Sequence, residues 1–247
     1  MLTADRKRRR NPVRTQPAIE AYGRKLRKIA EHVGTVINGF PPGIPSSAPT
    51  IEQLLNAYAD LLRDWATNTA SAMLMDVALR DEKSWMTHAK DLSVGLRKEI
   101  RNAPTGQVMR QLLSEQVVLI QSIPREAALR VHQLTLEGIA DSTRASEIAR
   151  EIMRSGEVAK SRALTIARTE VSRTAATLTQ ARAQSIGSDS YIWRTSGDSD
   201  VRSDHRALNG KVFQWSNPPI ADERSGARAH PGCIYNCRCY AEPILPF

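Results

Sequence analysis

The residues best suited to chemistry lie near the carboxyl-terminal end of the sequence. All three cysteines, Cys233, Cys237 and Cys239, fall within the last 15 residues, and His230 stands just before them. A second histidine, His205, lies in the polar stretch TSGDSDVRSDHRALNG. Thiolate and imidazole groups bind zinc well, and a zinc ion can stabilise a module that has a small core. One interpretation of this pattern is therefore a structural zinc site.

The spacing of these residues does not match a common structural zinc site. Such sites usually use two Cys-x(2–4)-Cys pairs, whereas the local run here is His230-x-x-Cys233-x-x-x-Cys237-x-Cys239. Residues two apart in an extended segment point to opposite faces, so one of the two cysteines would miss the ion. The alternative is that these cysteines are small buried hydrophobes. The zinc hypothesis stays open among the two histidines and the three cysteines, with His205 as a distant ligand.

Other chemistries fit the same residues less well. Cys-x-Cys is not the Cys-x-x-Cys redox motif, and three cysteines cannot all pair within one chain. An HNH-like nuclease centred on His205 and His230 would use a histidine base and a metal on phosphate, but no second cysteine pair frames the motif. A nucleotide deaminase is excluded, because neither His-x-Glu nor Pro-Cys-x-x-Cys occurs. Phosphate-loop, GxSxG and HExxH motifs are absent as well.

Positive charge is concentrated at the amino-terminal end. The net charge is +9, and before Thr50 there are ten basic residues against three acidic ones. An excess of this kind favours a polyanionic partner, most often nucleic acid. The run DRKRRRNPVR lacks apolar periodicity, so we expect a solvated basic arm. The candidate nucleic-acid-binding residues are Arg6, Lys7, Arg8, Arg9, Arg10 and Arg14.

The sequence shows no targeting signal or membrane span. No apolar core of about 7–15 residues follows the basic run, so we expect no signal peptide. No run of about 18 apolar residues occurs, and we expect no contact with a membrane. Three cysteines without a secretory signal favour a reducing cytoplasm.

Periodicity predicts an α+β fold in which a mainly helical amino-terminal body precedes a small module with a short antiparallel sheet. A 3.6-residue apolar period from a Thr50 cap to about Leu79 predicts a helix. Further helices are expected around Trp85–Ile100, Met109–Ile120 and beyond Pro124, then a short one closed by Gly156 and a long one over 157–186. Short aromatic and β-branched runs predict strands at 191–196, 211–215 and 239–245. We therefore expect a basic arm and linker over 1–49, a helical body over 50–156 and the module over 157–247.

Three segments resemble the phage Mu F-like head morphogenesis family of minor head proteins. They are IARTEVSRTAA (166–176), TSGDSDVRSDHRALNGKVF (195–213) and HPGCIYNCRCYAEPI (230–244). The resemblance covers roughly residues 140 to 245, and Cys233 is an extra cysteine relative to the pattern. For the zinc hypothesis the resemblance therefore implies the candidate ligands His205, His230, Cys237 and Cys239. Carried over by position, the motif residues are Thr169, Glu170, Asp198, Arg202, His205, Gly210, Pro231, Gly232, Asn236, Cys237, Arg238 and Cys239.

The resemblance implies a structural role in virus assembly and no catalytic activity. It implies a minor capsid protein that acts in procapsid assembly at the portal vertex, with portal, head and scaffold proteins and double-stranded DNA as partners. It would be found in the host cytoplasm during assembly and then inside the virion head. We expect no toxin domain after Phe247. The alternative from another class remains a metal-dependent DNA-processing enzyme of the HNH-like kind.

Clustered polar residues in a module with few apolar ones indicate a paired network, because buried polar groups need partners. We therefore expect the helix around Glu170 to pack on the small sheet. We also expect Glu170 to lie near one of the module's arginines, Arg202 or Arg238. Gly210 and Gly232 suit turns that need unusual backbone angles.

Overall fold

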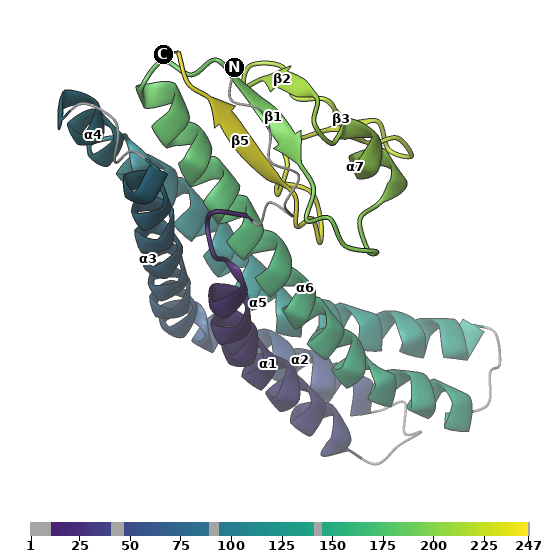
Figure 1. Cartoon of the computed structure of the whole chain (residues 1–247). Coiled ribbons are helices and arrows are strands. Elements are labelled where there is room, and N and C mark those ends of the chain that lie inside the picture. Colours follow the sequence, from purple (N-terminus) through teal and green to yellow (C-terminus); the bar gives the residue numbers. More distant parts are fainter. Residues whose placement is uncertain (1–10, 41–46, 89–93, 141–144, 247) are drawn as a thin grey trace. The chain divides into compact units, whose positions relative to one another are not determined.

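The computed structural model describes residues 11–40, 47–88, 94–140 and 145–246, and it confirms the α+β class (Figure 1). None of the described helices is long and apolar enough to cross a membrane. The helices are α1 (Gln16–Asn38), α2 (Ala48–Leu61), α3 (Arg63–His88), α4 (Val94–Arg101), α5 (Thr105–Ala140), α6 (Ala145–Ser185) and α7 (Ser203–Leu208). The strands are β1 (Ser190–Arg194), β2 (Val212–Gln214), β3 (Ile220–Asp222), β4 (Ala227–Arg228) and β5 (Tyr240–Ile244).

The chain divides into two compact units. The first, here called the module unit, contains Met73–Leu112 and Arg168–Phe247 together with the segment that precedes Ile19. The second, the bundle unit, contains Ile19–Ala72 and Leu113–Ala167. Helices α1, α3, α5 and α6 each contribute residues to both units, so the two units are not continuous segments of the chain.

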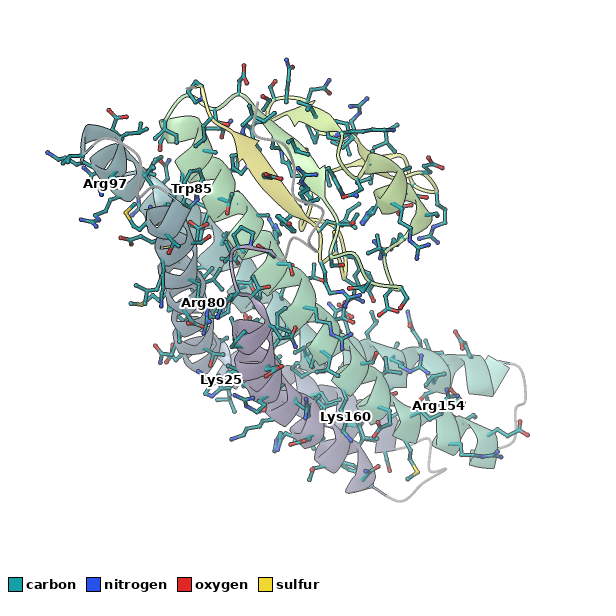
Figure 2. All side chains as sticks on the ribbon, in the orientation of Figure 1. Lys25, Arg80, Trp85, Arg97, Arg154 and Lys160 are labelled. Atoms are coloured by element: carbon teal, nitrogen blue, oxygen red, sulfur yellow. The ribbon has the colours of Figure 1, made fainter. Side chains whose placement is uncertain are left out.

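Helix α1 lies within the segment that the sequence predicted to be an arm and linker. Leu26, Ile29 and Val33 are buried along one side of it, while basic residues occupy the exposed side. Figure 2 shows one of these, Lys25, projecting from α1. The apolar period is strong enough to pack the helix against the bundle unit, so the basic charge of residues 24–28 is displayed on a folded helix.

Glycines bring α1 and α6 close together in the bundle unit. A Cβ added to Gly156 would lie 3.1 Å from the Cα of Gly34. Gly156 was expected to end a short helix, but α6 runs through it from Ala145 to Ser185. Gly156 therefore does not end a helix. Because it has no side chain, the backbones of α1 and α6 can approach each other closely at this point.

Two further helix boundaries differ from expectation. Helix α2 begins at Ala48, after Ser47, so Thr50 lies inside the helix and does not cap it. Helix α5 continues through Pro124, where a new start was expected. Proline in a helix costs about 3 kcal/mol. Burial of Ile120 and Ile123 before it and Val131 after it offsets that cost.

The module unit is built on a three-stranded antiparallel sheet with strand order β2-β1-β5, so the predicted sheet is confirmed. Strand β1 alternates between the two faces, and Tyr191 and Trp193 are fully buried. They pack with Trp215, and with Ala183 and Ile186 at the end of α6. A second, two-stranded sheet pairs β3 with β4.

A buried ion pair joins three helices of the module unit. Asp81 of α3 is 0% exposed and Arg182 of α6 is 3% exposed, with 2.8 Å between Arg182 Nε and Asp81 Oδ2. Thr179 donates a hydrogen bond to Asp81, and Arg182 Nη1 donates one of 2.6 Å to the carbonyl of Ile100 in α4. This network therefore sets how α3, α4 and α6 meet beneath the sheet.

Candidate functional site

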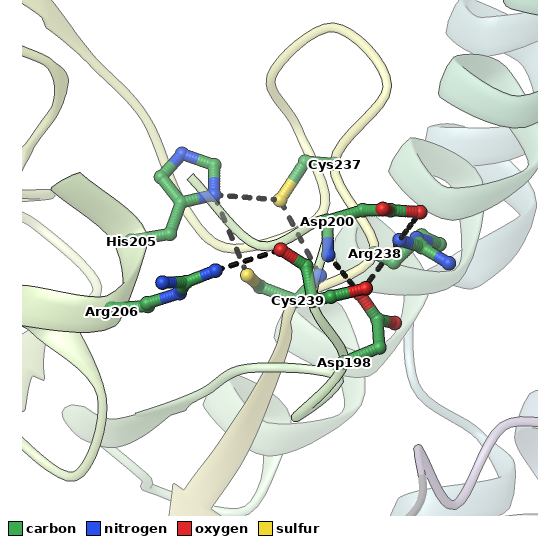
Figure 3. Close-up of polar contacts among 8 residues, drawn as sticks. Asp198, Asp200, His205, Arg206, Cys237, Arg238 and Cys239 are labelled. Atoms are coloured by element: carbon green, nitrogen blue, oxygen red, sulfur yellow. Dashed lines mark hydrogen bonds and ion pairs between the residues drawn. The ribbon is translucent and has the colours of Figure 1, made fainter. Parts of the chain in front are cut away.

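Three of the predicted site residues converge inside the module unit. His205 lies on α7, and Cys237 and Cys239 lie just before β5. His205 Nδ1 is 3.6 Å from Cys237 Sγ and 3.5 Å from Cys239 Sγ (Figure 3). The three residues are only 2%, 3% and 4% exposed. Together they form the His-Cys-Cys cluster, which is the set of described residues able to hold a metal ion.

The local backbone explains why both cysteines face His205, although opposite directions were predicted. Cys237 donates a backbone hydrogen bond of 3.0 Å to the carbonyl of Ile234, which closes a turn. Asn236 in this turn has φ 54°, in the left-handed region that asparagine tolerates. Strand β5 begins only at Tyr240, so the alternation of an extended strand does not apply to Cys237 and Cys239.

Hydrogen bonds orient the imidazole of His205 and hold one sulfur. His205 Nε2 donates to the carbonyl of Ala221 on β3 at 2.9 Å, which directs Nδ1 toward the sulfurs. The backbone N–H groups of Gly232 and Cys239 each donate to Cys237 Sγ at 3.4 Å. A side-chain hydrogen bond with the Cys239 thiol lowers the pKa of the Cys237 thiol well below its usual range, and His205 acts in the same direction. A hydrogen bond to Cys237 raises the pKa of His205.

His230 and Cys233 stand apart from the cluster. His230 Nδ1 lies 3.0 Å from the Tyr191 hydroxyl, and its ring packs against Trp215. Burial lowers the pKa of His230 and raises the pKa of Cys233 to about 12. The predicted ligand set of four is therefore reduced to three, and the two histidines do not form one centre.

The charged motif residues connect loops of the module. Arg238 pairs with Asp198 at 2.8 Å and with Asp200 at 3.3 Å. Arg202 Nη2 donates to the carbonyl of Tyr235 at 2.9 Å. Figure 3 shows Arg238 between its two carboxylates, close to the cluster. These contacts hold the segment around residues 198–202 against the turn that carries the cysteines.

Thr169 ties α6 to the module, and Glu170 is buried next to it on the same helix. Thr169 Oγ1 accepts a 3.0 Å hydrogen bond from the backbone N–H of Asn236, so α6 packs against the cysteine turn. Glu170 is 7% exposed and pairs with Arg173 of its own helix at 3.4 Å. Arg202 and Arg238 make the contacts with Tyr235, Asp198 and Asp200 described above. Arg173, one turn along α6, places a positive charge beside Glu170, and the proximity of Glu170 to Arg202 or Arg238 stays a prediction.

Two motif glycines occupy positions where a side chain is disfavoured. Gly210 has φ 82° and donates a 2.8 Å hydrogen bond to the carbonyl of Trp193. Gly232, which follows the buried Pro231, has φ 87°. A Cβ at Gly232 would lie 3.1 Å from the carbonyl oxygen of Cys239. Gly232 therefore lets the chain pass directly behind the cluster.

Sequence reasoning missed two neighbours of the cluster. Ala221 contributes only its carbonyl oxygen, which leaves no side-chain signal in a sequence. Trp193 packs edge-on against His205, with ring centroids 5.4 Å apart. It was assigned to a strand but not to the site, although a tryptophan in a short strand beside a polar motif is a usable signal. Of the predicted basic arm, Arg6 to Arg10 lie outside the described residues, and Arg14 is exposed.

Comparison with known proteins gives two matches. A 202-residue stretch, 81% of this chain, is 28% identical to an uncharacterized protein of Haemophilus influenzae. The chain spans only 44% of the length of that relative. No solved structure matches the chain. Residues 130–242 match the family described as Phage Mu protein F like protein.

The matched span contains the complete His-Cys-Cys cluster and every motif residue from Thr169 to Cys239. The resemblance drawn from the three sequence segments is therefore confirmed over residues 130–242, where the chain is similar to the phage Mu protein F-like family.

Proposed function

We propose that this protein is a minor head protein that acts structurally in phage head morphogenesis. The family match over residues 130–242 carries the proposal. The geometry of the module supports a structural role, because its motif residues bind one another. Arg238 pairs with aspartates, Arg202 with a backbone carbonyl and His205 with two cysteines.

The nuclease alternative draws less support from the geometry. A histidine base must reach a substrate within hydrogen-bond distance. His205 is 2% exposed, and Nε2 already donates to a carbonyl. His230 lies against Tyr191 and Trp215 instead of beside His205. A plasmid-nicking assay with added Mg²⁺, Mn²⁺ or Zn²⁺ tests this, and metal-dependent nicking that is lost in His205→Ala would overturn the structural role.

The portal vertex and the head interior are the proposed place of action. The test is mass spectrometry of purified procapsids, portal rings and virions from a phage that encodes this chain. We expect the protein in procapsids at a copy number far below that of the major capsid protein, and we expect a tagged copy to retain the portal protein. Procapsids that form normally and lack the protein would contradict the proposal.

We further propose that DNA is contacted by basic residues near the amino terminus. The run Arg6–Arg10 supplies charge, and α1 displays a second basic group on its exposed side: Arg24, Lys25, Arg27 and Lys28. Lysine and arginine contacts with phosphate give binding that weakens with salt, with a slope of about −0.9 in log K against log salt for each contact.

The DNA test separates these two groups. Deleting residues 1–10 leaves α1 intact, whereas a deletion reaching residue 28 would remove the buried Leu26. We expect the deletion to make the salt slope several units shallower, and glutamine at the four α1 positions to do so further. The control replaces four exposed arginines of α5 and α6 with glutamine: Arg110, Arg125, Arg150 and Arg154. An equal loss in the control, or binding that is insensitive to salt, would refute a role of the amino-terminal charge.

A further inference from the structure

The His-Cys-Cys cluster has the dimensions of a metal site. Zinc binds thiolate sulfur at about 2.3 Å and imidazole nitrogen at about 2.0–2.1 Å, so a tetrahedral site separates the two atoms by about 3.6 Å. His205 Nδ1 lies 3.6 Å from Cys237 Sγ and 3.5 Å from Cys239 Sγ. All the ligand atoms of the cluster lie within 4.8 Å of one another. The two nitrogen-to-sulfur distances therefore fit two edges of a coordination tetrahedron.

Hydrogen bonds around the cluster hold His205 and Cys237 in the forms that bind a metal ion. A histidine ligand usually donates its other ring N–H to a carbonyl or carboxylate, which fixes the tautomer. His205 does this through Nε2 and the carbonyl of Ala221. Backbone N–H groups from Gly232 and Cys239 point at Cys237 Sγ, as they do toward a charged sulfur. Because the proton is on Nε2, the lone pair of His205 Nδ1 faces the two sulfurs and is available to bind a metal ion.

Charge and ligand type select the ion. Burying two thiolates without compensation is costly, and a divalent cation neutralises both. Two sulfurs and one imidazole at tetrahedral spacing favour zinc over the octahedral oxygen-binding ions. A disulfide between Cys237 and Cys239 would remove both thiolates as metal ligands. His205 Nδ1 would then be the one remaining ligand of the cluster.

We infer that His205 Nδ1, Cys237 Sγ and Cys239 Sγ bind one zinc ion, which fastens α7 to the segment that leads into β5. The ligands are 32 and 34 residues apart in the chain, so the ion closes a loop between two elements with little regular structure of their own. The described residues supply three ligands, and water or a group from an assembly partner completes the coordination. The inference does not depend on the proposed function, since it rests on ligand geometry alone.

The first experiment measures metal content in the full chain, purified without chelator from zinc-supplemented medium. We expect about one zinc per chain, and less than about a tenth in Cys237→Ser and in His205→Ala. Cys233→Ser and His230→Gln are matched controls, since they remove a cysteine and a histidine of the same segment that lie outside the cluster. Both controls should retain zinc. Zinc that persists in the Cys237 and His205 variants, or that disappears in either control, would overturn the assignment.

A second measurement uses the unaltered protein, so it holds even if a variant fails to fold. Cobalt is exchanged for zinc, and the absorption spectrum should show a sulfur-to-cobalt charge-transfer band with tetrahedral d–d bands. Chelation should expose two additional reactive thiols and lower the melting temperature, and added zinc should restore both. A protein with less than about a tenth of an equivalent of zinc and a mass two hydrogens lighter would show a disulfide instead, and the inference would be wrong.

Discussion

The buried pair between Asp81 and Arg182 allows a quantitative test of how the helices of the module unit are held. Replacing Arg182 with methionine keeps most of the side-chain volume and removes the charge. Asp81 is then left at 0% exposure with only the Thr179 hydroxyl as a bonded partner among the described contacts. Breaking a buried pair in this way costs about 3–5 kcal/mol. For a chain of this size we expect a fall of roughly 6–20 °C in melting temperature.

The double variant Asp81→Leu with Arg182→Met makes the test specific. Burial raises the pKa of Asp81 although Thr179 and Arg182 lower it, so removing the charged carboxylate relieves a desolvation cost. Replacing both members of a buried pair with apolar residues is often neutral. We therefore expect the double variant to be more stable than Arg182→Met alone, with some loss remaining because the carbonyl of Ile100 loses its donor.

The assay is urea unfolding of all three proteins, followed by far-ultraviolet circular dichroism and tryptophan fluorescence. A second readout is pH. The raised pKa of Asp81 means that its contribution to stability is present below the ordinary value of 3.8 and is lost as pH rises through the folded-state pKa. The deficit of Arg182→Met should therefore shrink as the solution is acidified. A single variant that loses less than about 1 kcal/mol, or a double variant that is less stable than the single one, would refute the reasoning.

Three further predictions concern glycines and one histidine. Gly232→Ala should cost more stability than Gly226→Ala by about 1–3 kcal/mol, because both have positive φ but only the former meets atoms within 4 Å; equal losses in thermal melts would contradict this. Gly156→Ala should destabilise by about 1 kcal/mol or more through contact with α1, whereas Gly106→Ala near the start of α5 should be neutral or stabilising; calorimetry of both variants checks the difference. Burial lowers the pKa of His230, so its contribution is present above the ordinary value of 6.5 and is lost as pH falls through the folded-state pKa; His230→Gln should flatten the melting temperature between pH 7 and 5, and an unchanged slope would count against it.

Local patterns were sufficient to predict the class of fold and several elements. The aromatic and β-branched runs that predicted strands became β1, β2 and β5, since such runs between turn residues have few other ways to bury their side chains. The apolar line of the last long helix was also found, because it repeats over many turns. Boundaries within helices were less predictable. Pro124 and Gly156 are usual helix-ending residues, yet both lie inside helices because neighbouring residues pack tightly around them.

The sequence by itself singled out His205, Cys237 and Cys239 as candidates, because their side chains have distinctive chemistry within a recognisable motif, but it also included His230. It did not determine how they are arranged. The turn at Asn236 directs both sulfurs the same way, and the carbonyl of Ala221 selects the tautomer of His205. It likewise gave no sign that His230 would face Tyr191, or that Asp81 would meet Arg182 across 101 residues. Those outcomes depend on backbone angles and on contacts between distant segments, which only the tertiary structure decides.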